Sequence, residues 1–269
     1  MSEIRYSIAD LLRVMQRLRD PQSGCPWDLE QTFDSIVPST LEECYELADA
    51  ISHRDYPHIA EELGDVLFQV VFYAQMAQEQ NLFSFDSVVD TLVEKLVRRH
   101  PHVFADGEIE GVVDSAASIA SVKASWEAIK QQERQSREQH GVLSDVPVAL
   151  PALPRAQKLQ KRAAQVGFDW ADIKGAASKL EEELAELMLA LDGDDADRVA
   201  EELGDLMFSC VNVARHLGAD AEATLRQASG KFESRVQRME SLAAQRGERL
   251  DALDDSQLDA LWRQAKAKG

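Results

Sequence analysis

Two copies of the hexapeptide AEELGD, at residues 60–65 and 200–205, combine three acidic residues with one glycine. A glycine inside a helix costs about 1 kcal/mol relative to alanine, and clustered carboxylates on a helix repel one another. An ExxE motif precedes each copy, with Glu43 and Glu46 in the first half and Glu183 and Glu186 in the second. Such paired carboxylates are typical ligands of a divalent cation. The repeated motif therefore predicts a metal-binding function.

The acidic residues fall on one flank of an apolar stripe when each segment is placed on an α-helix with 100° per residue. In the second half this stripe lies beside Glu183 and Glu186 on one helix, and beside Glu202 and Asp205 on the next. If a short turn makes the two helices antiparallel neighbours, the four carboxylates converge at the edge of their contact. The same arrangement in the first half involves Glu43, Glu46, Glu62 and Asp65. A site built only from oxygen ligands favours Mg²⁺, Mn²⁺ or Ca²⁺ over zinc.

Helical periodicity dominates the elements that must position these acids. We expect helices over residues 7–19, 40–52, 57–80, 85–99 and about 116–139, the first of them opened by a capping box of Ser7 and Asp10. The acidic segments of the two halves match at a constant offset of 140 residues, and Lys95, Arg99 and Trp126 match Lys231, Arg235 and Trp262 at an offset of 136. An internal duplication of an all-helical unit explains both observations.

The predicted fold is therefore all-α, with two tandem homologous domains built from antiparallel helix pairs. Three prolines between Pro147 and Pro154 indicate a linker. We expect an N-terminal domain over residues 1–142, a proline-rich linker over 143–154 and a C-terminal domain over 155–269. The apolar stripes are expected to form the contacts between the paired helices.

Composition narrows the class of partner. The net charge of −19 over 269 residues argues against a nucleic-acid polymer or an anionic membrane. The three cysteines form no CxxC pair, the N-terminus lacks the apolar region of a signal peptide, and no stretch of 18 apolar residues occurs. These features predict a cytoplasmic protein with reduced thiols.

The motifs LRDPQSGCPWDLEQT, TLEECYEL, GDVLFQVVFYAQMA, RRHPHVF, VGFDW and KFESR together resemble the MazG family of all-α nucleoside triphosphate pyrophosphohydrolases. The resemblance covers nearly the whole chain. It implies a homodimeric, Mg²⁺-dependent hydrolase, with Mn²⁺ as an alternative ion. Its reaction converts nucleoside triphosphates, ribose or deoxyribose, to the monophosphate and pyrophosphate by cleavage between the α- and β-phosphates.

The resemblance also implies roles for individual residues of the second half. The metal ligands are Glu183, Glu186, Glu202 and Asp205, whereas Glu43, Glu46, Glu62 and Asp65 form a second, weaker or structural metal site. The residues expected to bind substrate are Lys179, Glu182, Glu201, Lys231, Arg235 and Trp262, and Glu182 is the candidate general base. Because Ser39 occupies the first-half position of Lys179, we expect the second half to be the main active site.

Two other interpretations are compatible with the acidic motifs. A carboxylate-bridged di-iron protein also uses glutamates on facing helices, but it requires Glu-x-x-His motifs that are absent here. An acidic helical interaction module without catalysis fits the charge, but not the Lys and Arg residues that follow each acidic motif.

The six histidines show no ligand spacing and are expected to be surface or capping residues. Arg98 and Arg99 could bind either phosphate or a helix C-terminus.

Overall fold

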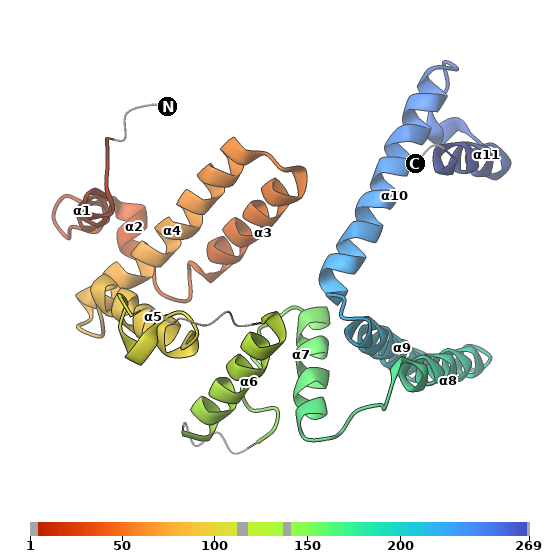
Figure 1. Ribbon diagram of the computed structural model, residues 1–269. Helices are drawn as coiled ribbons and strands as arrows, with labels where there is room; N and C mark the ends of the chain where they lie inside the picture. Colours follow the sequence, from red (N-terminus) through yellow and green to blue (C-terminus); the bar gives the residue numbers. More distant parts are fainter. Residues whose placement is uncertain (1–4, 112–117, 137–140, 268–269) are drawn as a thin grey trace. The chain divides into compact units, whose positions relative to one another are not determined.

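The computed structural model describes residues 5–111, 118–136 and 141–267, and within these ranges helices are the only regular secondary structure and no strand is present (Figure 1). The chain forms two compact units, Met1–Glu133 and Arg134–Gly269. The predicted all-α fold with tandem helical units is confirmed. The division between the units falls inside one helix, before the expected linker at 143–154, and the next helix begins at Ala152. The exact domain boundaries remain a prediction.

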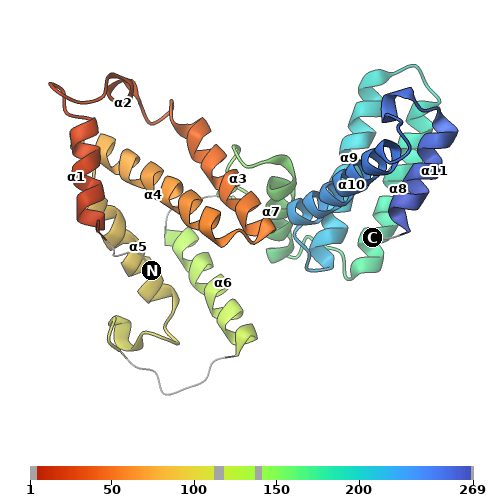
Figure 2. The same cartoon turned by 90° about the horizontal axis from the view of Figure 1, so that it is seen from above.

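The first unit is organised around two long antiparallel helices, α3 and α4, which lie side by side in both views (Figures 1 and 2). Its elements are α1 (Ile8–Leu18), α2 (Pro26–Glu30), α3 (Val37–His53), α4 (Tyr56–Glu79), α5 (Phe85–Arg99), the 3₁₀ turn η1 (Ala105–Gly107) and α6 (Ile119–Ser136). Only the C-terminal half of α4 lies in the core, where Val71, Phe72 and Met76 pack with Met15 of α1 and with Ile36. The N-terminal half of α4, which carries the acidic motif, therefore lies outside this core.

A buried ion pair fixes α1 against the end of α4. The guanidinium of Arg19 donates to both carboxylate oxygens of Glu79, at 2.8–3.1 Å, and also to the backbone carbonyl of Asp28. It lies over the ring of Phe72, 5.4 Å from the ring centroid. Because Arg19 is buried, these partners replace the water that its charge would otherwise bind.

The second unit repeats the antiparallel pair with α8 and α9. Its elements are α7 (Ala152–Gln165), α8 (Ile173–Leu191), α9 (Ala196–His216), α10 (Ala221–Ala244), the 3₁₀ turn η2 (Leu250–Ala252) and α11 (Asp255–Lys266). A separate core forms where α10 meets α11, around Met239, Ala243 and Leu261. The acidic stretch of α8 and α9 again lies outside the main core of its unit.

Aspartate residues define where the helices of the second unit begin. The carboxylates of Asp172, Asp195, Asp220 and Asp254 accept hydrogen bonds from the first backbone amides of α8, α9, α10 and α11. In the first unit Asp55 caps α4, directly after Arg54, whose left-handed backbone (φ 58°) ends α3.

The predicted helices at 7–19, 40–52, 57–80 and 85–99 agree with α1, α3, α4 and α5, and the capping box of Ser7 and Asp10 is present. Residues 116–117 and 137–139 of the fifth predicted helix lie outside the described residues.

Apolar side chains remain exposed along the helix pairs. Leu184 and Met188 of α8 and Leu203 and Met207 of α9 are each about half-exposed within one chain. The predicted apolar stripe is therefore only partly covered by the chain's own helices. Among the described residues, no helix has both the length and the hydrophobicity that crossing a membrane requires.

Candidate active site

Three of the four carboxylates predicted to converge in the second unit lie close together. Glu183 and Glu186 of α8 and Glu202 of α9 each offer an oxygen, and these oxygens all lie within 4.8 Å of one another. Glu183 is buried, while Glu186 and Glu202 are partly exposed. The antiparallel contact of α8 and α9 therefore assembles one cluster from residues up to 19 positions apart in the sequence. Three acidic oxygens at this spacing can bind one divalent cation.

Cationic side chains compensate part of this negative charge. The ammonium of Lys179 lies 2.9 Å from the carboxylate of Glu183 and 2.7 Å from that of Glu182. Arg198 lies 3.8 Å from Glu202. Desolvation and the nearby Glu202 carboxylate nevertheless raise the pKa of Glu186, an effect that Lys179 opposes. The cluster thus holds more negative charge than its own chain neutralises.

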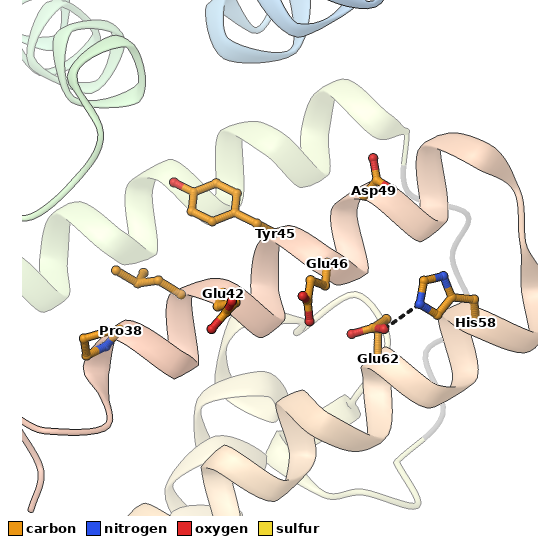
Figure 3. Close-up of a pocket in the computed structure, with 8 residues that line it drawn as sticks. Pro38, Glu42, Tyr45, Glu46, Asp49, His58 and Glu62 are labelled. Carbon is orange, nitrogen blue, oxygen red and sulfur yellow. Dashed lines mark ion pairs between the residues drawn. The ribbon is translucent and has the colours of Figure 1, made fainter.

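The first unit contains the matching cluster of Glu43, Glu46 and Glu62, again with oxygens within 4.8 Å of one another. Figure 3 shows Glu46 of α3 facing Glu62 of α4 across a cavity of about 740 Å³, which is also lined by Leu41 and Tyr45. Glu62 is buried, and its Oε2 atom has no hydrogen-bond partner. Burial, followed by the carboxylates of Asp65, Glu46 and Glu62, raises the pKa of Glu43. This cluster also lacks full compensation.

His58 is exposed, as expected of the histidines, but it also contacts one of the predicted metal ligands. Its Nε2 atom lies 2.7 Å from Glu62, at the edge of the first cluster (Figure 3). The corresponding residue of the second half, 140 positions later, is Arg198, which contacts Glu202. In both halves a basic residue therefore stands four positions before the same glutamate. That repeated spacing is a signal in the sequence that could have identified both residues.

The fourth acid of each predicted set lies outside the convergent group. Asp65 and Asp205 are both exposed, and neither belongs to the three-carboxylate cluster of its unit. Asp65 is still close enough to influence the pKa of Glu43. Gly64 and Gly204 face open space, where an added Cβ atom would meet nothing within 4 Å. A close approach within the same chain therefore does not explain these glycines.

Lys231, Arg235 and Trp262, all predicted to bind substrate, lie on α10 and α11. The guanidinium of Arg235 lies 5.5 Å from the ring centroid of Trp262, and Phe232 packs against the same indole. Lys231 is exposed and precedes Arg235 by one helical turn on α10. Within the described part of the chain, neither Lys231 nor Arg235 is paired with a carboxylate. Glu182 and Glu201 are exposed on the flanks of the acidic helices.

The corresponding residues of the first unit are arranged differently. Arg98 and Arg99 bind the carboxylate of Glu133 on α6, at 2.8 Å and 2.5 Å, rather than a helix C-terminus. Trp126, the counterpart of Trp262, makes an edge contact with His100 instead of an arginine. The two halves therefore differ in the contacts of the predicted phosphate-binding residues, although their acidic clusters are alike.

The fold and the clusters define a tandem all-α protein with a carboxylate site on each of two antiparallel helix pairs. The MazG nucleotide pyrophosphohydrolase domain matches this chain twice, at residues 31–104 and 173–239. These ranges contain α3 and α4 in the first unit and α8 and α9 in the second. The chain belongs to the MazG nucleotide pyrophosphohydrolase family, and it is an enzyme of that family.

Two curated relatives match over nearly their whole lengths. A protein of Escherichia coli strain K12 named "Nucleoside triphosphate pyrophosphohydrolase" is 49% identical over 258 residues, which cover 95% of both chains. A protein of Thermotoga maritima named "Nucleoside triphosphate pyrophosphohydrolase/pyrophosphatase MazG" is 42% identical over 266 residues, covering 99% of this chain and 98% of the relative. The similarity thus includes both helical units.

Proposed function

We propose that this protein hydrolyses nucleoside triphosphates between the α- and β-phosphates, with the nucleoside monophosphate and pyrophosphate as products. The convergence of Glu183, Glu186 and Glu202 in a member of this family is the observation that carries the proposal. The names of the relatives from E. coli and T. maritima support the same substrate class.

The acidic cluster of the second unit fits Mg²⁺, with Mn²⁺ as an alternative. Its three residues offer only carboxylate oxygens, which these hard cations prefer, and burial together with the carboxylate of Glu202 raises the pKa of Glu186. Asp205 follows Glu202 by one helical turn and is proposed as the fourth ligand. When bound there, a divalent cation supplies neutralisation of the triphosphate charge and activation of a water molecule.

In this proposal, residues of α8, α9, α10 and α11 bind and orient the substrate. Lys231 and Arg235 contact the phosphates and stabilise negative charge on the departing pyrophosphate, because no carboxylate among the described residues neutralises them. Trp262 stacks on the base or shapes its pocket beside Arg235. Glu182 accepts a proton from the attacking water, while Lys179 orients its carboxylate through the 2.7 Å ion pair. Glu201 completes the substrate-facing flank of α9.

We assign the main activity to the second unit. Its cluster has Lys179, whereas the first unit has Ser39 at that position. Its Arg235 lies against an aromatic ring, whereas Arg99 is already bound to Glu133. The cavity at the first cluster and the orphaned oxygen of Glu62 favour a second metal site there, with a weaker or structural role.

The half-exposed apolar residues of α8 and α9 support a homodimer. Leu184, Met188, Leu203 and Met207 lie beside the acidic cluster and are uncovered in one chain. A second copy would bury them, which is favourable by about 25 cal/mol for each Å² of apolar surface removed from water. Light scattering coupled to size exclusion tests this directly: a dimer mass is expected, and a monomer at micromolar concentration contradicts it.

Product analysis tests the proposed reaction. Purified protein is incubated with ATP and with each of the other NTPs and dNTPs in the presence of Mg²⁺, and the phosphorus-containing products are resolved by ³¹P NMR. Monophosphate and pyrophosphate are expected in equal amounts. The appearance of diphosphate and orthophosphate would contradict cleavage at the α–β bond. Bound iron on elemental analysis would instead favour a di-metal protein of other chemistry.

A further inference from the structure

The two units differ at residues that the internal repeat makes equivalent. Arg99 of α5 and Arg235 of α10 are 136 positions apart, as are Trp126 of α6 and Trp262 of α11. In the second unit the arginine lies over the tryptophan, with its guanidinium 5.5 Å from the ring centroid. In the first unit no such contact is present among the described residues, and the arginine binds a carboxylate instead.

Glu133 is that carboxylate, and it holds two arginines at once. Its Oε2 accepts from Nη2 of Arg99 at 2.5 Å, and its Oε1 accepts from Nη2 and Nε of Arg98 at 2.8 and 3.1 Å. The side chain of Glu133 is only 17% exposed. These arginine hydrogen bonds lower the pKa of Glu133 to about 2, so the carboxylate is charged throughout the physiological range. Two guanidinium groups converging on one oxyanion is also the arrangement by which proteins bind phosphate.

The tryptophan of the first unit also makes different contacts from its counterpart in the second unit. The indole of Trp126 lies 5.1 Å from His100 in an edge contact, and its Nε1 atom is buried without a hydrogen-bond partner. The equivalent of Glu133 at the 136-residue offset is Gly269, which has no side chain to offer. The second unit therefore has no acidic residue at the equivalent position.

We propose that Glu133 acts as an internal anion in a latent polyphosphate-binding site formed by Arg98 and Arg99 of the first unit. The inference rests on the proposed function, because it treats Arg99 as the counterpart of a phosphate-binding arginine. The carboxylate is tethered within the same chain, so it competes at an effective concentration that a free phosphate group rarely reaches. The first unit retains the counterpart of Arg235, but Glu133 keeps that arginine and the adjacent Arg98 occupied. Removal of the Glu133 charge opens the site.

The test measures binding to the first unit while the second is disabled. Lys231→Ala with Arg235→Ala provides a full-length background in which the proposed phosphate contacts of the second unit are absent. The probe is α,β-methylene ATP with Mg²⁺, which cannot be cleaved between its α- and β-phosphates, and the measurement is isothermal titration calorimetry. Addition of Glu133→Gln to this background is expected to tighten probe binding at least tenfold.

Two further variants show which charge is responsible for the gain in probe affinity. Arg99→Ala, added to the variant with Glu133→Gln, is expected to remove the gained affinity, because it deletes the released cation. Asp90→Asn is the charge-matched control: Asp90 is exposed on α5 and makes no described ion pair, so binding should stay at the background level. A similar gain from Asp90→Asn would mean that net charge alone is responsible, and the proposal would fall.

The affinity of the Glu133→Gln variant for the probe tests the proposal as long as the variant stays folded. Circular dichroism checks the fold. If helical signal is lost, Glu133→Ala replaces that variant, since alanine also removes the charge and is the strongest helix former at this position of α6. A folded variant that binds the probe no more tightly than the background overturns the proposal. Because turnover by the second unit plays no part in this assay, its failure is distinguishable from failure of the proposed reaction.

Discussion

The Nζ atom of Lys179 lies 2.9 Å from the carboxylate of Glu183, a buried member of the second acidic cluster. The same ammonium lies 2.7 Å from Glu182 on the exposed flank of α8. The hydrogen bonds to these two glutamates raise the pKa of Lys179, so its positive charge is retained. Lys179 therefore supplies part of the countercharge that a metal ion would otherwise provide.

We predict that Lys179→Ala separates metal binding from turnover. Without the ammonium, Glu183 no longer has an internal competitor, so Mn²⁺ binding to nucleotide-free protein should tighten about threefold (about 0.7 kcal/mol, a modest charge competition). Steady-state kcat/KM should fall about tenfold or more, because a cation facing the phosphates is lost. Calorimetry gives the first value and pyrophosphate release the second.

Lys174→Ala is the matched control for that experiment. Lys174 is exposed near the start of α8 and makes no described ion pair, so the same charge change should alter neither quantity. Weaker Mn²⁺ binding in Lys179→Ala would show that the lysine assists the metal rather than competing with it.

Substitution of equivalent glutamates should reveal which unit catalyses the reaction. Glu183→Ala is expected to lower kcat/KM about 100-fold or more, since it removes a buried metal ligand of the main site. Glu43→Ala removes the equivalent acid of the first unit and should cost less than about threefold. Pyrophosphate release with ATP, measured on both variants in parallel, checks the pair. Equal losses, or a larger loss in Glu43→Ala, would show that the main site has been assigned to the wrong unit.

The raised pKa of Glu186 predicts how stability depends on pH in the absence of metal. Between its ordinary value of 4.5 and the raised value, the folded protein binds more protons at this residue than the unfolded chain does. The contribution of Glu186 to the free energy of unfolding therefore falls as pH rises through this window. Glu186→Gln removes the charge, so this variant should melt above the wild-type protein at pH 7.5 in EDTA, with the difference disappearing below pH 4.5.

Thermal melts followed by circular dichroism test this difference between the two proteins. Comparing the two proteins cancels the contributions of groups whose pKa is lowered, such as Asp10 and Glu133. Their contribution to the free energy of unfolding is lost only at more acidic pH. Addition of Mg²⁺ at pH 7.5 should raise the melting temperature of the wild type more than that of Glu186→Gln. A melting difference that is constant with pH would show that Glu186 titrates normally.

The ion pair of Arg19 and Glu79 should stabilise the first unit independently of activity. Glu79→Gln leaves the buried guanidinium without its charged partner, and hydrogen bonds to charged groups contribute about 1.5–3 kcal/mol. We expect a loss of about 2 kcal/mol in the free energy of unfolding of that unit. Urea titration measures the loss, while pyrophosphate release should be unchanged under native conditions. An unchanged urea midpoint would mean that water replaces the carboxylate at no cost.

Local sequence patterns determined the helices and much of both acidic clusters. Hydrophobic periodicity acts within a few residues, so α3, α4 and α5 could be predicted with nearly the observed bounds. The repeat of ExxE and ExxD at a constant offset indicated that two helices present acids to one another, because helix geometry fixes which side chains share a flank. Glu183, Glu186 and Glu202 follow from that rule.

Only the tertiary structure decided which charges neutralise one another. Arg99 and Glu133 are 34 residues apart, and no local rule connects them, so the sequence left Arg99 open to a phosphate or a helix end. The placement of α6 beside α5 settled that choice within the first unit. Likewise Asp205 shares its motif with Glu202 but lies outside the convergent oxygens, since three-dimensional packing sets the distances between helices. Periodicity specifies the direction of a side chain on its own helix, whereas ion pairs depend on positions set by the whole fold.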